Sequence, residues 1–330
     1  MASFSKFGND LYTGARSYNI IGRRRIWFSI AGALVLIAIL VPVFKGFNFS
    51  VEFSGGSEFT VSGLAANPSQ AIATKAVGKV VPGEVPKVLV AGGKSIQVTT
   101  SLLSTDKTQD VVTALAKAYN VPKSKVASTF IGATWGSDIT KAAVEALIAF
   151  IVLAVIIMAL YFRTWKMSVA AIVALFHDLI IVVGVYAILG FEVSPDAVIG
   201  LLTILGYSLY DTVVVFDKIR ENTNEDGEKS VRTFSESVNL AVNQTLVRSI
   251  NTSVVALLPV AAILFIGATL LGAGTLRDIS LALFVGILSG TYSTIFVAAP
   301  LYALLREGEP EIKKRTTRTT VARTTSGAVR

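Results

Sequence analysis

Four ionisable side chains lie inside long apolar stretches of this sequence, where a charge is costly: His177, Asp178, Asp211 and Arg248. A charged group at the centre of a membrane-spanning helix costs about 2.5 to 3.5 kcal/mol or more, so it usually faces a partner or a water-filled cavity. Each of the four therefore belongs either to a functional site or to a static network that joins helices. The residue types alone leave both interpretations open.

The stretch around Asp211, residues 201–217, is apolar on both sides of the carboxylate. Burial disfavours the charged form of a carboxylate, and a nearby cation favours it. A carboxylate held between these influences can take up and release a proton, as a proton relay requires. Arg248 begins a later apolar stretch, and Thr252 lies one helical turn further on the same face. Because arginine stays charged, we expect Arg248 to pair with a carboxylate and to respond when that group is neutralised.

His177 and Asp178 occupy the middle of another apolar stretch. Histidine titrates near neutral pH, which suits a proton shuttle, although a static pair would also account for the two residues. A charged group at the end of the Asp211 stretch is interpreted as an interfacial ring that ends the helix: Asp217, Lys218, Arg220 and Glu221. Four glycines predict close packing between helices: Gly200, Gly206, Gly286 and Gly290.

The composition indicates an integral membrane protein. Hydrophobic residues make up 52% of the 330 residues and charged residues only 16%, and the mean hydropathy is +0.64. A soluble chain of this size cannot bury so much apolar surface. The net charge of +8 is explained by cations that collect on cytoplasmic loops. No recognition motif accompanies the charge, so the partner we expect is a lipid membrane and not nucleic acid.

Several kinds of chemistry are excluded by what the sequence lacks. It has no cysteine, which excludes disulfides, thiolate metal sites and cysteine nucleophiles, and its single histidine cannot form a multi-histidine metal site. Gly92-Gly93-Lys94-Ser95 imitates the end of a phosphate-binding loop, but Val88 stands where the first glycine is needed. The sequence therefore predicts no enzyme, no metal and no cofactor.

Apolar segments long enough to cross a bilayer position these groups. They predict six transmembrane helices, at 26–44, 139–162, 168–190, 196–217, 247–267 and 279–304. The first segment resembles a signal peptide, but it is too long and no A-x-A-like site follows it. Cations concentrate in residues 1–25, in a loop at 218–246 and in a tail at 305–330, which places both termini in the cytoplasm. We expect the basic tail to be disordered.

Residues 45–138 are soluble in character and read as one small domain outside the cytoplasm. Apolar and polar residues alternate over 47–53, as in a strand, and Asn67-Pro68 predicts the start of a helix. The order that follows from such signals is β-α-β-β-α-β, which predicts an α+β ferredoxin-like sandwich. Its elements are strands at 47–53 and through Val61, a helix from 67 to Val80, strands at 87–90 and 95–100 joined by a turn at Gly92-Gly93, a helix at 106–119 and a strand at 125–131.

One motif resembles a known family. The stretch LTILGYSLYDTVVVFDKIREN at residues 202–222 is similar to the signature of the SecF family, LTIIGYSINDTVVVFDRIREN. Other similar marks are His177-Asp178, Phe53–Ser57, the run 243–250 with Thr252-Ser253, and Gly290–Ser293, so the resemblance covers about 45 to 305. The chain departs from the family pattern in several places: Tyr210 replaces Asn, Lys218 replaces Arg, Glu52 replaces Asp and Ala133 replaces Pro.

The resemblance implies an α-helical polytopic membrane protein of RND type that pairs with six-helix SecD in pseudo-twofold fashion. It implies a proton path through Asp211, Arg248 and Thr252 that works against an aspartate of SecD, with the His177-Asp178 pair as a further candidate. The complex would use the protonmotive force to help draw preproteins through the SecYEG channel after SecA has acted. The implied location is the bacterial inner membrane, and the further implied partners are YajC and YidC.

Two other functions compete with this interpretation. One is half of an RND exporter of drugs or lipids, although such proteins carry a much larger extracytoplasmic domain than 45–138. The other is a passive scaffold that stabilises the channel and moves no protons. A substitution of Asp211 separates the scaffold from the proton-coupled machine.

Overall fold

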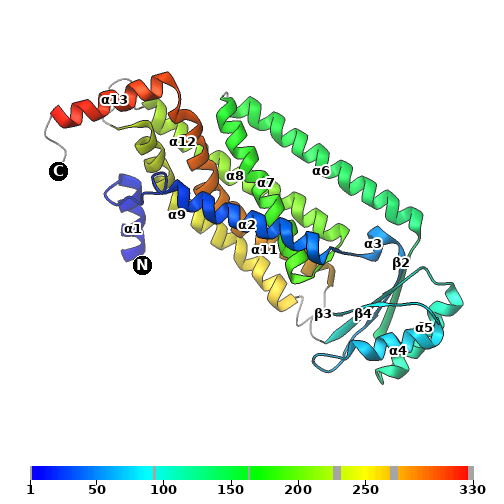
Figure 1. The fold of residues 1–330 in the computed structure, drawn as a ribbon. Coiled ribbons are helices and arrows are strands. Elements are labelled where there is room, and N and C mark those ends of the chain that lie inside the picture. Colours follow the sequence, from blue (N-terminus) through cyan, green and yellow to red (C-terminus); the bar gives the residue numbers. More distant parts are fainter. Residues whose placement is uncertain (1, 92–93, 163, 226–231, 268–273, 326–330) are drawn as a thin grey trace.

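The structure, a computed structural model, describes residues 2–91, 94–162, 164–225, 232–267 and 274–325. Figure 1 shows a bundle of long helices with a small sheet domain at one end and both chain termini at the other. We call these the domain end and the terminal end. The chain leaves the bundle once, after its first long helix, to build the domain, and then returns to it.

Six helices among the described residues are long and apolar enough to cross a membrane, which confirms the predicted number of spans. Two of them contain π-helical turns, η2 and η3. Their bounds are α2 (Arg24–Lys45), α6 (Ala133–Phe162), α7 (Trp165–Leu189), α8 (Pro195–Glu225), α9 with η2 (Phe234–Ala262 and Ile263–Gly267), and α11 with η3 and α12 (Gly274–Ser293, Thr294–Ala298 and Ala299–Glu307).

Three of the helices, α7, α8 and α11, form the centre of the bundle, and α2, α6 and α9 turn most of their apolar surface outward. Glycines allow α11 to approach α8: a Cβ on Gly286 would lie 2.3 Å from Ile204, and one on Gly200 would lie 2.9 Å from Ala282. The packing predicted for these two positions is therefore confirmed. The same prediction is wrong for Gly206, where an added Cβ meets nothing within 4 Å.

The domain is a four-stranded antiparallel sheet with two helices on one face, and its strand order is β3-β4-β2-β5. This is the predicted ferredoxin-like topology, which is confirmed. Its elements are β2 (Gly56–Val61), α4 (Gln70–Val80), β3 (Lys87–Ala91), β4 (Ser95–Thr100), α5 (Thr105–Ala118), the short 3-10 helix η1 (Lys123–Lys125) and β5 (Val126–Ile131).

The alternation of residues along β2 divides the sheet into an apolar face and a polar face. Phe59 and Val61 are fully buried in the core that the sheet forms with α4 and α5. Glu58 and Thr60 therefore lie on the opposite face, which no helix of the domain covers. This polar face is the side from which the domain can contact the bundle.

Two details of the predicted domain are wrong. Residues 47–53 are not one strand, since β1 (Asn48–Phe49) pairs in parallel with β6 (Glu192–Val193) and is followed by a helical turn, α3 (Val51–Ser54). The aromatic alternation reflects packing on the bundle and not a place in the large sheet. Helix α4 begins later than predicted, because Asn67 takes a left-handed backbone (φ 53°) that turns the chain first. The predicted turn at Gly92-Gly93 lies outside the described residues.

The terminal end is more helical than the sequence analysis predicts. Helix α8 runs on to Glu225 and α9 begins at Phe234, so most of the predicted loop 218–246 is helix. Phe234 and Val238 continue the buried side of α9 beyond the predicted span, which explains the extension. Thr233 and Glu236 close its start with a reciprocal capping box.

Both terminal segments also contain helices. The tail, expected to be disordered, forms α13 (Pro310–Thr325), which is anchored because Ile312 is buried in the core of the terminal end. The segment 1–25 begins with α1 (Ala2–Thr13). The backbone that follows is fixed on α9, where Asn243 accepts a hydrogen bond from the amide of Tyr18 at 2.7 Å and Asn239 accepts one from Ile20 at 2.9 Å.

Candidate functional site

Asp211 is a buried carboxylate on α8 whose two oxygens have different surroundings. Its side chain faces α9, where the hydroxyl of Ser249 donates a hydrogen bond to Oδ1 at 2.8 Å. The other oxygen, Oδ2, is buried without a hydrogen-bond partner, and the residue is only 8% exposed. A buried acceptor without a partner costs about 1 to 3 kcal/mol. The arrangement therefore holds this carboxylate in an unsatisfied state.

Arg248 precedes Ser249 on α9 and forms no ion pair with Asp211, and its expected pairing with a carboxylate stays a prediction. Its guanidinium donates to the hydroxyl of Tyr210 at 3.4 Å, and no nitrogen of Arg248 lies within 4 Å of an Asp211 oxygen. The reason is that Asp211 points between α8 and α9, whereas Arg248 and Tyr210 are exposed on the outer flank. The hydroxyl of Thr252 donates a hydrogen bond to the carbonyl of Arg248 at 2.8 Å.

Asp178 is buried more deeply than Asp211, at 1% exposed, and is fully hydrogen-bonded. Hydroxyls from two helices donate to it, Ser208 of α8 at 2.6 Å and Ser289 and Ser293 of α11 at 2.7 and 2.8 Å. The Nδ1 atom of the neighbouring His177 lies 3.1 Å from Oδ1. An ionised carboxylate only accepts hydrogen bonds, so this ring of donors is suited to a charged Asp178.

A glycine makes the ring around Asp178 possible. A Cβ on Gly290 of α11 would lie 3.0 Å from the Ser208 side chain and 3.5 Å from Oδ2 of Asp178. The contact with Ser208 is tighter than ordinary packing, so a larger residue would push α11 away from α8. The close packing predicted for Gly290 is therefore confirmed, and here it brings three hydroxyls to one carboxylate.

His177 contributes one of its two ring nitrogens to this cluster. The Nε2 atom is buried without a hydrogen-bond partner, and the ring lies beside that of Tyr292, with centroids 6.0 Å apart. The structure thus joins His177 and Asp178 as neighbours in contact. It does not join them to Asp211, because the two carboxylates share no hydrogen-bond partner among the described residues.

The hydroxyl groups are the functional residues that sequence reasoning missed. They recur one turn apart on apolar helices, as in Ser289 with Ser293 and Ser249 with Ser253, and a second contact joins Thr212 of α8 to Thr294 at 2.9 Å. Spacing of four residues puts such groups on one side of a helix. Small hydroxyl residues repeating at this spacing within a span are the signal that could have identified them.

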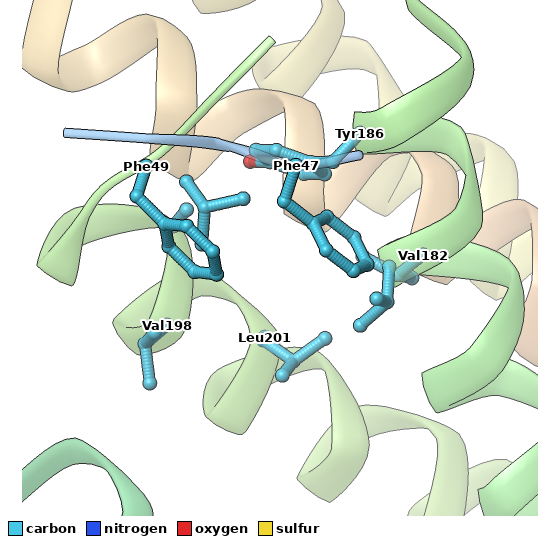
Figure 2. A pocket seen from close by; sticks show the side chains of 9 residues that line it. Phe47, Phe49, Val182, Tyr186, Val198 and Leu201 are labelled. Carbon is cyan, nitrogen blue, oxygen red and sulfur yellow. The ribbon is translucent and has the colours of Figure 1, made fainter. Parts of the chain in front are cut away.

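An apolar hollow lies at the domain end, away from these carboxylates (Figure 2). It has a volume of about 220 Å³ and is lined by Phe47 and Phe49 of the β1 segment and by Val182, Val198 and Leu201 of α7 and α8. Tyr186 also lines the hollow, and its hydroxyl donates to the carbonyl of Asp278. The other lining side chains are apolar, so the candidate site is the pair of carboxylate positions in the bundle.

Two family models match this chain. Residues 111–308 match the family model of the protein export membrane protein SecD/SecF, C-terminal, and residues 41–62 match the SecD/SecF GG motif. The chain is 43% identical over 314 residues to the protein translocase subunit SecF of Streptomyces coelicolor, covering 95% of this chain and 83% of that protein. It is 41% identical over 332 residues to SecF of Mycobacterium tuberculosis, covering 98% and 74%.

A solved structure has the same fold. The crystal structure of SecDF, a translocon-associated membrane protein from Thermus thermophilus, aligns with a TM-score of 0.78 at 33% sequence identity. The alignment covers 88% of this chain and 39% of the SecDF chain. The chain described above thus corresponds to about two fifths of that longer protein.

Proposed function

The chain belongs to the SecF branch of the SecD/SecF family of protein-export membrane proteins, whose general role is protein translocation, and we propose that it couples this role to the protonmotive force through Asp211. The observation that supports the proposal is the state of this carboxylate. It is buried inside a span, holds a single hydrogen bond, and leaves its second oxygen bare. A carboxylate in these surroundings becomes more stable when it binds a proton.

The coupling follows from how the two charge states pack. A neutral Asp211 can remain between α8 and α9 with its one bond to Ser249. An ionised Asp211 needs another donor or water, which requires α8 and α9 to shift or a partner to approach. One charge that crosses 100 mV supplies about 2.3 kcal/mol. This is enough to change the ratio of two conformations by more than tenfold.

Arg248 provides the second element of the proposal. It is exposed on the flank of an apolar helix, and its 3.4 Å contact with Tyr210 does not neutralise it. A cation in this position needs an acidic partner within the membrane. We propose that SecD covers this flank and supplies an aspartate that pairs with Arg248 when Asp211 is neutral. Thr252, one turn along, would hold its hydroxyl close to the same interface.

The orientation is a further part of the proposal. Exposed cations collect at the terminal end, including Lys313, Lys314 and Arg318 of α13. By the positive-inside rule this end lies in the cytoplasm of a bacterium, and the ferredoxin-like domain lies outside the inner membrane. The domain would then be placed to act on a preprotein that leaves the SecYEG channel after SecA has acted, with YajC and YidC as further partners.

The test is Asp211→Asn in cells that lack the native copy. We expect the complex with SecD to assemble at its normal level, while export no longer accelerates when the protonmotive force is present. The matched control is Asp217→Asn, since Asp217 lies six residues further along the same helix and is exposed. Export by the control should keep its full dependence on the protonmotive force.

Two outcomes would contradict the relay. If Asp211→Asn assembles and retains protonmotive-force-dependent export, the passive scaffold becomes the better description. If both variants lose the dependence equally, the effect belongs to charge on α8 in general and not to the buried carboxylate.

A further inference from the structure

A second group of carboxylates lies where the sheet domain meets the bundle. The polar face of the sheet contacts the β1–β6 ribbon, which is attached directly to the spans α2, α7 and α8. There the side-chain amide of Gln97 on β4 donates to Oε2 of Glu192 on β6 at 2.9 Å. Glu192 is only 7% exposed although it lies outside the spans. A carboxyl group thus serves as a contact between domain and bundle.

The charged groups that face Glu192 come from three further elements. Glu58 projects from the polar face of β2 near Gln97, Glu52 comes from α3, and Asp278 comes from α11. The neighbouring cations are engaged elsewhere. Arg277 binds Asp278 at 3.2 Å, and Lys45 donates to the carbonyl of Ile188 at 2.7 Å. Among the residues that the structure describes, carboxylates therefore outnumber the available cations at this junction.

The remaining attachment of the domain has the form of a hinge. Both chain connections pass beside the contact between α3 and the start of α6, where a Cβ on Gly136 would lie 2.8 Å from the carbonyl of Phe53. The connection into β2 passes through Gly55 and Gly56, which both have positive φ. Figure 1 shows β2 leading up to α3 and α6 at this point. The Gln97–Glu192 contact is formed by a different strand of the sheet, apart from these connections.

We propose that Glu192, Glu58 and Gln97 form a pH-sensitive latch between the domain and the bundle. The latch holds the domain against the bundle while one of the two carboxyl groups is protonated. It releases the domain when both carboxyl groups are ionised. With one group protonated, the pair is no longer two like charges, and the Gln97 amide keeps its hydrogen bond to Glu192. With both ionised, two negative charges face one another at a buried contact, where only a neutral amide separates them.

The direction of the pH dependence follows from the pKa of Glu192. Burial, and next the charge of Glu58, raise this pKa from 4.5 to about 7, and burial also raises the pKa of Glu58. A docked Glu192 therefore binds a proton more tightly than a released, hydrated one. Docking is strongest at low pH, weakens by up to about tenfold per pH unit between about 4.5 and 7, and levels off above that.

The latch does not depend on the proton path through Asp211. It depends on the proposed orientation only for its use in the cell, where the domain would lie on the side from which protons enter. There, proton release and uptake at Glu192 would set how often the domain leaves the bundle.

The distance between domain and bundle tests the proposal. The chain has no cysteine of its own, so spin labels can be attached to Lys107→Cys on α5 and Leu189→Cys at the end of α7, both exposed positions. Double electron–electron resonance is recorded on the whole chain in nanodiscs at pH 5 and pH 8. We expect one narrow distance at pH 5 and a second, longer one at pH 8, with the docked-to-released ratio lower by on the order of a hundredfold.

The variants identify the group responsible. Glu192→Gln should keep the short distance at both pH values, and Glu58→Gln, which removes the facing charge, should reduce the fall in the ratio several-fold. Asp110→Asn, an exposed carboxylate on α5, and Asp211→Asn should each retain the full pH dependence, which separates this latch from the proton relay. Identical distance distributions at pH 5 and pH 8 would overturn the proposal, as would a Glu192→Gln protein that still opens at pH 8.

Discussion

Asp178 and Asp211 are both aspartates buried in the middle of the same bundle, yet their surroundings are opposite. Asp178, among α7, α8 and α11, accepts hydrogen bonds from three hydroxyls and lies beside a histidine nitrogen. Asp211, between α8 and α9, accepts one hydroxyl and keeps one oxygen without a partner. Burial alone therefore does not decide what an intramembrane carboxylate does. The number of donors around it does.

The difference arises from the helices that face each group. α11 is in the centre of the bundle, and its glycines and serines let its backbone approach α7 and α8. α9 is peripheral and presents a single hydroxyl to Asp211. A carboxylate whose oxygens all have hydrogen-bond donors stabilises one arrangement of helices. A carboxylate with an oxygen that lacks a donor can favour two arrangements. The hydrogen bonding thus favours a structural role for Asp178, and it supports the proposal that Asp211 is the group that changes its protonation.

The largest effect is expected from removing the saturated carboxylate. Asp178→Ala leaves the hydroxyls and the His177 nitrogen facing a cavity, and each buried group without a partner costs about 1 to 3 kcal/mol. We expect a loss of about 3 kcal/mol or more in the free energy of unfolding, measured by denaturation in detergent. Asp211→Ala, which removes one hydrogen bond and one unsatisfied oxygen, should stay within about 1 kcal/mol of the parent protein. Equal losses for the two variants would contradict the distinction.

A smaller effect tests the packing that builds the Asp178 ring. Gly290→Ala places a methyl group 3.0 Å from Ser208, and overpacking of this kind costs about 1 to 3 kcal/mol. The matched control is Gly206→Ala on α8, where the added methyl meets nothing within 4 Å. That variant should be neutral or more stable by about 0.5 to 1 kcal/mol, because alanine favours the helix. The two melting temperatures should move in opposite directions, and equal shifts would argue against the close approach.

The smallest effect compares single donors. Ser289→Ala removes one donor from the Asp178 ring, so we expect a loss of about 1 kcal/mol in stability and unchanged export. Ser249→Ala removes the single hydroxyl bound to Asp211. It should leave stability within about 1 kcal/mol, yet change the protonmotive-force-dependent export rate on the order of tenfold. Export assays and unfolding measured on the same two proteins would separate the two roles. If Ser289→Ala changed export and Ser249→Ala did not, the roles assigned to Asp178 and Asp211 would have to be exchanged.

Most of the fold was accessible from sequence patterns, and the failures have physical causes. The apolar segments predict six spans because each must match the bilayer thickness. The order of the expected strands and helices predicts the ferredoxin-like domain, whose core Phe59 and Val61 occupy. The loop at 218–246 was predicted wrongly because its residues are too polar to belong to an apolar span. Thr233 and Glu236, three residues apart, nevertheless form a capping pattern that marks the start of a helix.

The site was accessible only in part. Charged residues in apolar stretches are rare enough to be noticed singly, which is why His177, Asp178, Asp211 and Arg248 could be named in advance. Serines are common in apolar helices, so the residue type alone could not mark Ser249 and Ser293 as parts of the site. Nor could the sequence show that Arg248 and Asp211 lie on different sides of the contact between α8 and α9, because neighbouring positions along two helices do not reveal which side of each helix faces the other.

By itself, the sequence determined the class of the protein, the number of its spans, the topology of its domain and the identity of the charges inside its spans. These depend on hydropathy, on periodicity and on the cost of a charge in hydrocarbon, all of which are local properties of the chain. The tertiary structure alone decided which carboxylate is saturated and which is left with a bare oxygen. It also decided that Glu192 of a short loop meets the sheet of a domain more than ninety residues earlier, at Gln97. Hydrogen bonds between distant segments exist only once helices and sheet have packed, so no local pattern can specify them.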